Sequence, residues 1–190
     1  MVAERRQKLE RVLKTLGIAD KPVWLTETGS SSLTSHSSGR GDNVSEQSQA
    51  ADVFRRVLSA WGAGDQAVFW QIQIIPAKIC RNRWRGYGLK DDQAQAKQAF
   101  WAYRLLAGHL AAHESVKPVT GLGRGQHGYE IVRQDGSMRW VFWGRGQVDA
   151  PLKDPAKAFT SVIPDAKGRY TWRGVPDRIE LSEIPVLLRN

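Results

Sequence analysis

Two side chains with chemical potential lie in short apolar segments of the sequence. Glu27 is near the end of the segment Val23–Gly29, and Trp70 lies in the segment Ala67–Ile75. A carboxylate at the carboxyl end of a strand can act as a nucleophile or as a general acid or base, or it can be a solvated charge. The indole of Trp70 offers a flat apolar face to a ligand, or it fills the core. The residues alone leave both alternatives open.

The histidines and glycines give weaker signals. His36 lies in a Ser-rich stretch, residues 30–43, which is predicted to be an exposed loop, so His36 is either a ligand contact or a solvated side chain. His109 and His113 are one helical turn apart, but Leu-Ala-Ala separates them and no third metal ligand is apparent. The glycine pattern at 123–128 precedes a predicted strand, which is the wrong context for a dinucleotide site. We therefore expect no metal and no cofactor.

The segment Lys78–Lys90 combines arginines with aromatic residues, with Arg83 and Trp84 in its middle. Such a mixture can bind single-stranded nucleic acid, or hold an anionic or branched glycan through arginine forks and aromatic stacking. A solvated loop is the third interpretation. The net charge of +9 is compatible with an acidic partner.

Length and composition bound the class of protein. The 190 residues allow one ordinary domain or two small ones. No apolar run approaches the ~18 residues that span a bilayer, so we expect no membrane partner. The single cysteine, Cys80, excludes an internal disulfide. The charged start is not a secretory signal, so a cytoplasmic location is expected for the chain as it stands.

The elements that position these residues follow from hydrophobic periodicity. Helices are predicted over 3–16, 45–61 and 91–112, with strands over 23–29 and 67–75 between them, an alternation typical of parallel βα units. After Pro118, short segments alternate with turns and predict an antiparallel β module, with strands over 128–134, 138–143, 159–163, 169–172 and 178–188. We therefore expect domains at 1–116 and 117–190.

The stretch Lys21-Pro-Val-Trp-Leu-Thr-Glu-Thr-Gly29 resembles the seventh strand of clan-A glycoside hydrolases, which are (β/α)-barrel enzymes of the cellulase, β-xylosidase and iduronidase type. Residues 67–71 resemble the eighth strand, and 97–106 are similar to the closing helix of that barrel. Residues 180–188 resemble the last strand of the β-sandwich that many of these enzymes carry. The fold class this implies is α/β plus all-β: the last two βα units of a truncated TIM barrel, followed by a small antiparallel β-sandwich.

The resemblance implies roles for several residues. Glu27 would be the catalytic nucleophile, Trp70 would floor the sugar subsite, and His36, Arg83 and Trp84 would contact substrate. The acid/base residue of this clan normally follows an asparagine, and no Asn-Glu dipeptide occurs in the sequence. Because a retaining glycosidase needs two carboxylates, we expect a fragment of a retaining glycoside hydrolase that is inactive alone.

The expected partners follow from this interpretation. They are a carbohydrate substrate, a polypeptide that supplies the missing barrel strands, and a second copy of the chain. Self-association is expected because strand edges and the apolar helix faces at 9–16 and 53–61 would be exposed. The alternative is a non-catalytic basic module that binds an anionic polysaccharide or nucleic acid. Full-length enzymes of the kind it resembles are often exported.

Overall fold

Helices and strands alternate in the first half of the chain, and antiparallel strands make up most of the second. A computed structural model describes residues 2–32, 44–70, 86–91, 93–150, 157–165 and 167–190. The first half contains α1 (Val2–Thr15), β1 (Trp24–Thr28), α2 (Glu46–Trp61), β2 (Ala67–Trp70) and α3 (Gln98–Leu110). The second half contains β3 (His113–Pro118), β4 (His127–Arg133), β5 (Met138–Trp143), β6 (Gly146–Asp149), β7 (Ala158–Ser161), β8 (Arg173–Gly174), β9 (Arg178–Leu181) and β10 (Val186–Arg189).

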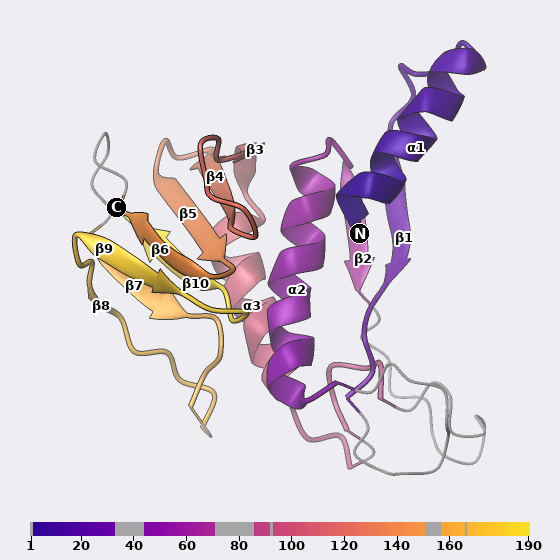
Figure 1. Ribbon diagram of the computed structural model, residues 1–190. Coiled ribbons are helices and arrows are strands. Elements are labelled where there is room, and N and C mark those ends of the chain that lie inside the picture. Colours follow the sequence, from indigo (N-terminus) through magenta and orange to yellow (C-terminus); the bar gives the residue numbers. More distant parts are fainter. Residues whose placement is uncertain (1, 33–43, 71–85, 92, 151–156, 166) are drawn as a thin grey trace.

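The described strands are arranged in layers around two helices. The strands β1 and β2 pair in parallel, whereas β3–β4–β5–β10–β7–β8 form an antiparallel sheet of six strands, and β6 pairs with β9. Figure 1 shows the antiparallel strands on one side, α3 and α2 beside them, and the β1–β2 pair beyond α2. The order helix–strand–helix–strand–helix and the antiparallel second half confirm the coarse expectation of an α/β part followed by a β part. The division at residue 116, which falls within β3, stays a prediction.

Local capping signals fix both ends of α2. The hydroxyl of Ser45 accepts a hydrogen bond from the Ser48 amide at 3.1 Å, which is the usual N-cap arrangement. At the other end, the Gly62 amide donates to the Leu58 carbonyl at 2.8 Å. A Cβ atom at position 62 would lie 2.3 Å from the ring of Tyr129, so glycine allows β4 to pack closely against this helix end.

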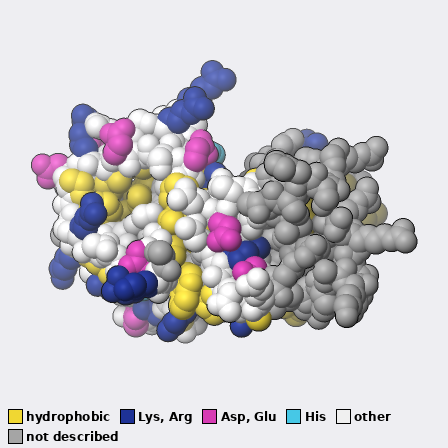
Figure 2. All heavy atoms as spheres, turned by 90° about the horizontal axis from the view of Figure 1, so that it is seen from below, with side chains coloured by type: hydrophobic (Ala, Val, Ile, Leu, Met, Phe, Trp, Pro, Cys, Tyr) yellow, Lys and Arg dark blue, Asp and Glu magenta, His cyan; other side chains and the backbone are white. Residues whose placement is uncertain are grey.

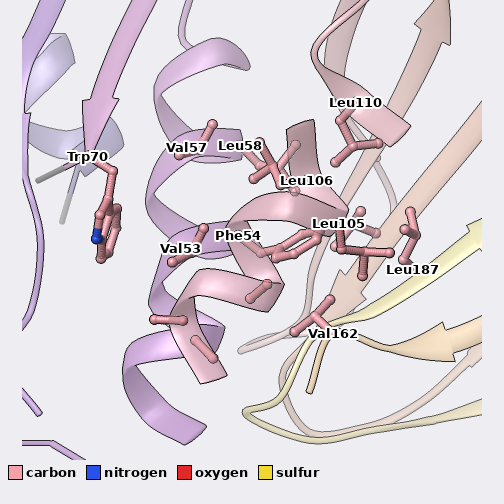
Figure 3. Packing of buried hydrophobic residues seen from close by; sticks show 14 of the residues in the cluster. Val53, Phe54, Val57, Leu58, Trp70, Leu105, Leu106, Leu110, Val162 and Leu187 are labelled. Atoms are coloured by element: carbon pink, nitrogen blue, oxygen red, sulfur yellow. The ribbon is translucent and has the colours of Figure 1, made fainter. Parts of the chain in front are cut away.

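The main core lies between the two helices and the six-stranded sheet. Figure 3 shows that the apolar stripe of α2 packs against α3, while Leu187 and Val162 reach in from the sheet side. Large side chains here are fully buried and include Phe54, Leu58 and Leu110. A second cluster, with Trp140, Phe142, Val148, Ile179, Leu181 and Leu188, fills the space between the other face of this sheet and the β6–β9 pair. Alternation along β5 and β10 supplies both clusters.

Three predicted elements differ clearly from the structure, and the sequence pattern does not predict β3 or β6. Residues 71–75 of the strand expected over 67–75 lie outside the described residues. The third helix begins at Gln98 rather than at 91, because the Asp91 carboxylate accepts hydrogen bonds from the amides of Gln93 and Gln95 (2.9 and 2.8 Å) and closes a turn. Residues 169–172 are not a strand; β8 comprises only Arg173–Gly174. The expected strand 178–188 is two strands, β9 and β10, because a turn at 182–185, in which the Ser182 hydroxyl accepts from the Ile184 amide, separates them.

Two apolar helix faces, at 9–16 and 53–61, are expected to be exposed, and only the first of them is. On α1, Leu9 and Val12 are exposed, as is Leu16 just after the helix. The face at 53–61 is not exposed: its apolar residues lie in the main core, because α3 and the antiparallel sheet cover it. The prediction that this second face would drive self-association is therefore wrong. Among the described helices, none has the length and apolarity that a bilayer span requires.

Candidate functional site

Glu27 lies near the carboxyl end of β1, next to the parallel strand β2. Its side chain is exposed, and within the described residues it has neither a hydrogen bond nor an ion pair. The register pairs Leu25 with Val68 and Thr28 with Trp70, so an irregularity falls between Leu25 and Thr28. This irregularity interrupts the simple alternation along the strand, by which Leu25 and Glu27 would share a face. Glu27 is therefore a solvent-accessible carboxylate on a strand end whose backbone departs from regular pairing.

The chain that leaves β1 is anchored by a buried polar side chain from α2. Gln49 has no exposed surface, and its amide nitrogen donates to the carbonyls of Ser30, Gly86 and Tyr87 at 2.7, 2.9 and 3.2 Å. Its amide oxygen accepts from the hydroxyl of Ser32 at 2.8 Å. One side chain thus ties the segment after β1 to the segment that precedes α3. It holds the backbone three residues beyond Glu27.

A buried lysine completes this network. Lys97, which immediately precedes α3, is 6% exposed, and its ammonium group donates to the Ser32 hydroxyl at 3.0 Å and to the Gly86 carbonyl at 2.8 Å. The Ser32 amide also donates to the Gly86 carbonyl at 3.1 Å. We call Gln49, Ser32 and Lys97, with the carbonyls they bind, the buried polar network. It ties Ser30 and Ser32, which follow β1, to Gly86 near the carboxyl end of β1, where Glu27 lies.

Trp70 ends β2 and lies in the main core rather than on an open surface. It is 4% exposed and belongs to the cluster that includes Val53 and Val57 of α2 (Figure 3). Its indole nitrogen is buried without a hydrogen-bond partner among the described residues. This packing matches the interpretation of Trp70 as a core residue, while its role toward a sugar stays a prediction.

The β1–β2 pair has an aromatic face open to solvent. Trp24 and Phe69 are 58% and 51% exposed, and their ring centroids are 6.2 Å apart. Val68 and Trp70 belong instead to the helix-side cluster. The strand pair is therefore covered by α2 on one face and leaves an apolar pair uncovered on the other.

The other residues singled out in the sequence divide into those that the structure describes and those that it does not. His36, Arg83 and Trp84 lie outside the described residues. His109 packs against Trp172 with ring centroids 5.3 Å apart, whereas His113 packs against Trp61 at 4.5 Å. The two histidines thus contact different aromatic rings.

The positive charge of the chain is dispersed on the face that Figure 2 shows. Lys and Arg side chains are scattered over the described part of this face, among acidic and apolar side chains. Several arginines lie in local ion pairs, such as Arg55 with Asp52 at 2.7 Å and Arg169 with Asp165 at 2.8 Å. The net charge alone therefore does not mark a binding surface on this face.

Sequence reasoning misses the buried polar network. A signal for it exists, because Gln49 precedes Val53 and Val57 at intervals of four residues and so continues the apolar stripe of α2. A polar residue on a buried stripe needs hydrogen-bond partners. The sequence could not indicate that those partners are carbonyls near residues 30 and 86.

Comparison with known proteins finds likeness at the level of structure. No protein-family model matches the chain, and no curated protein matches it in sequence. A family 39 glycoside hydrolase from the gut symbiont Bacteroides cellulosilyticus WH2 matches 97% of the chain with a TM-score of 0.68 and 19% identity. A glucosidase from Croceicoccus marinus matches 97% with a TM-score of 0.58 and 12% identity.

The matched region is a part of each of these larger structures. The chain spans 37% of the family 39 structure and 48% of the glucosidase structure. At these levels of identity, the likeness concerns the fold. Nearly the whole described arrangement, from α1 to β10, thus has a glycoside hydrolase-like fold.

Proposed function

We propose that the chain is the C-terminal portion of a retaining glycoside hydrolase, with Glu27 as its nucleophile. The observation that carries the proposal is that 97% of the chain superposes on a family 39 glycoside hydrolase, while Glu27 is exposed at the carboxyl end of a parallel strand. Active sites of (β/α) barrels lie at that end of the strands. The expected substrate is a poly- or oligosaccharide, cleaved at a glycosidic bond.

The proposed role of Glu27 follows from the mechanism of retaining glycosidases, which use two carboxylates. One carboxylate attacks the anomeric carbon, and a second, about 5–5.5 Å away, protonates the leaving oxygen and later activates water. The sequence has no Asn-Glu pair to supply that second group, and the chain spans 37% of the matched hydrolase. We therefore expect the chain to bind or hydrolyse little sugar until a polypeptide provides the remaining strands.

The buried polar network would hold the backbone next to the proposed nucleophile in place. It fixes the backbone beyond Glu27 to Gly86 and to α2, so the carboxylate would keep its position as a partner polypeptide adds its strands. Trp70 is proposed as the floor of the sugar subsite. His36, Arg83 and Trp84, which follow β1 and β2 in the sequence, are proposed substrate contacts.

The test is reconstitution with an activated substrate. The 190-residue chain is mixed with a polypeptide that carries the first six βα units of a family 39 barrel, and release of dinitrophenol from aryl glycosides is measured. This leaving group needs no proton, so the nucleophile is tested separately from the acid. We expect Glu27→Gln to lower the rate by at least about 10³-fold.

The control is Glu180→Gln, which removes an exposed carboxylate on β9 that binds Gln147. It should leave the rate of the reconstituted protein unchanged. Hydrolysis that survives Glu27→Gln would refute the assignment of the nucleophile. Mass spectrometry of the complex trapped with a 2-deoxy-2-fluoroglycoside should find the sugar on the peptide that contains Glu27.

A further inference from the structure

Three arginines gather on the helix-covered face of the six-stranded sheet. Arg139 of β5 lies directly opposite Arg189 of β10 in the register, and Ile131 of β4 lies opposite Arg139 on its other side. Arg133, two residues beyond Ile131, is therefore a diagonal neighbour of Arg139. Alternation puts these arginines on the same face as Ile131, Val141 and Leu187, which belong to the main core.

Two aromatic groups border the three arginines, which we call the arginine cluster. The guanidinium carbon of Arg189 lies 4.0 Å from the centroid of the Trp172 ring, and His109 of α3 lies 5.3 Å from the same ring. Burial, and then the charges of Arg139, Arg189 and Arg133, lower the pKa of His109 below its usual value. The three guanidinium charges therefore lower the pKa of His109 in the same direction as its burial does.

The cluster holds more positive charge than its described neighbours balance. Arg139 is 8% exposed, and its hydrogen bonds go to the Met138 carbonyl at 2.6 Å and the Asn190 amide oxygen at 3.3 Å, both uncharged. Within the described residues, neither Arg139 nor Arg189 forms an ion pair, and Arg133 pairs with Asp135 at 3.0 Å. Like charges directly opposite each other on adjacent strands are destabilising.

Unused donors point to a missing acceptor. The Nε atoms of Arg139 and Arg133 are buried and have no hydrogen-bond partner among the described residues. Buried polar groups are nearly always bonded, and an arginine fork matches an oxoanion in geometry and charge. The negative end of the α3 dipole lies nearby, but in the described part of the chain no hydrogen bond joins a cluster arginine to a carbonyl of that helix.

We propose that the arginine cluster binds a tetrahedral oxoanion of the phosphate or sulfate class. The anion sits between Arg139 and Arg189, takes a further contact from Arg133, and relieves the repulsion among the three guanidinium groups. Arg189 is held in place by the face of Trp172, and His109 borders the site from α3. The site lies on the antiparallel sheet, so it is independent of Glu27 and of the proposed glycosidase function.

The test is isothermal titration of the full 190-residue chain with inorganic phosphate, and separately with inorganic sulfate, at an ionic strength held constant with sodium chloride. Saturable binding is expected, and the anion that binds with the higher affinity in these two titrations is the preferred ligand. Arg189→Gln and Arg139→Met should each weaken binding about tenfold or more. Arg169→Gln, which changes an exposed arginine paired with Asp165, is the matched control and should bind as the unmodified chain does.

Thermal unfolding in chloride alone provides a second readout. If the arginine cluster binds an anion, its three positive charges repel one another when phosphate and sulfate are absent. Arg189→Gln removes one of these charges, so the unfolding midpoint of this variant in chloride should equal or exceed that of the unmodified chain. Added phosphate should then raise the midpoint of the unmodified chain more than that of this variant. Equal binding by all variants, absence of saturation, or a large loss of stability for Arg189→Gln in chloride would each overturn the proposal. Should Arg139→Met fail to fold, the binding measured for Arg189→Gln decides the question, because Arg189 is only half-buried.

Discussion

At the scale of single residues, His109 should make stability depend on pH. Burial and the charges of Arg139, Arg189 and Arg133 lower its pKa in the folded chain, whereas in the unfolded chain it titrates near the usual value of about 6.5. Between these two values the unfolded state binds more protons, so the free energy of unfolding rises with pH across this window. The contribution of His109 to the free energy of unfolding is therefore greatest above pH of about 6.5. It declines as the pH falls toward the folded-state pKa of His109.

Urea unfolding at pH of about 7.5 and about 5.5, on either side of the usual histidine pKa, measures this effect. The unmodified chain should lose more stability on acidification than His109→Asn, because the asparagine does not titrate. His127→Asn is the matched control, since His127 is exposed on β4. If His109→Asn and the unmodified chain show the same loss, the half-buried His109 does not govern the loss of stability on acidification.

At the scale of elements, Gln49 links α2 to the segments that follow β1 and precede α3. Gln49→Leu keeps the approximate size of the side chain but removes the hydrogen bonds to the carbonyls of Ser30, Gly86 and Tyr87 and to the Ser32 hydroxyl. The Gly86 carbonyl and the Ser32 hydroxyl keep their bonds to Lys97. Each buried polar group that loses its partner costs about 1–3 kcal/mol, and partial rearrangement should limit the total loss to about 2–4 kcal/mol. The free energy of unfolding from urea titration checks this value.

The comparison variant is Gln47→Leu, which makes the same change two residues earlier on α2, where the side chain is exposed. It should change the free energy of unfolding by no more than about 0.5 kcal/mol, because it breaks no buried contact. Equal effects of the two substitutions would mean that the buried polar network does not stabilise the loop ends.

The elements differ in how far local sequence determines them. The helix α2 is predicted to within one residue, because Ser45 and Gly62 cap it and its stripe is regular. The start of α3 is not, because the Asp91 side chain forms a turn where the helical spacing of apolar residues suggests a helix. The position of Glu27 at a strand end can be predicted from its flanking residues. The Gln49 network cannot, because its bond to Gly86 joins positions 37 apart.

At the scale of the whole molecule, one core serves both the helices and the antiparallel sheet. Phe54 of α2 and Leu106 of α3 belong to the same cluster as Ile131 of β4 and Leu187 of β10. The β part therefore buries one face against the helices and the other against the β6–β9 pair. Because removal of the helices would expose Ile131, Val141 and Leu187 of the sheet, the β part alone should be less stable than the chain.

Among the described residues, the large exposed hydrophobic side chains lie on α1, just after it, and on the β1–β2 pair. Figure 1 shows α1 reaching beyond the rest of the chain. Leu9, Val12 and Leu16 are 39%, 54% and 63% exposed, and Trp24 and Phe69 form an exposed aromatic pair. Exposed apolar surface favours association between chains, all the more so beside β1 and β2, whose outer edges pair with no other described strand. We therefore expect the chain to self-associate, and to do so through the β1–β2 pair.

Sedimentation velocity over a range of concentrations tests this expectation. The double variant Trp24→Ser and Phe69→Ser should shift the distribution toward monomer, because it removes the aromatic pair and leaves the helix-side core intact. The double variant Leu9→Ser and Val12→Ser measures the contribution of α1 separately, since it changes an apolar surface on another element. A monodisperse monomer for the unmodified chain at every concentration would contradict the expectation. Equal association of the aromatic variant and the unmodified chain would place the contact elsewhere than on the β1–β2 pair.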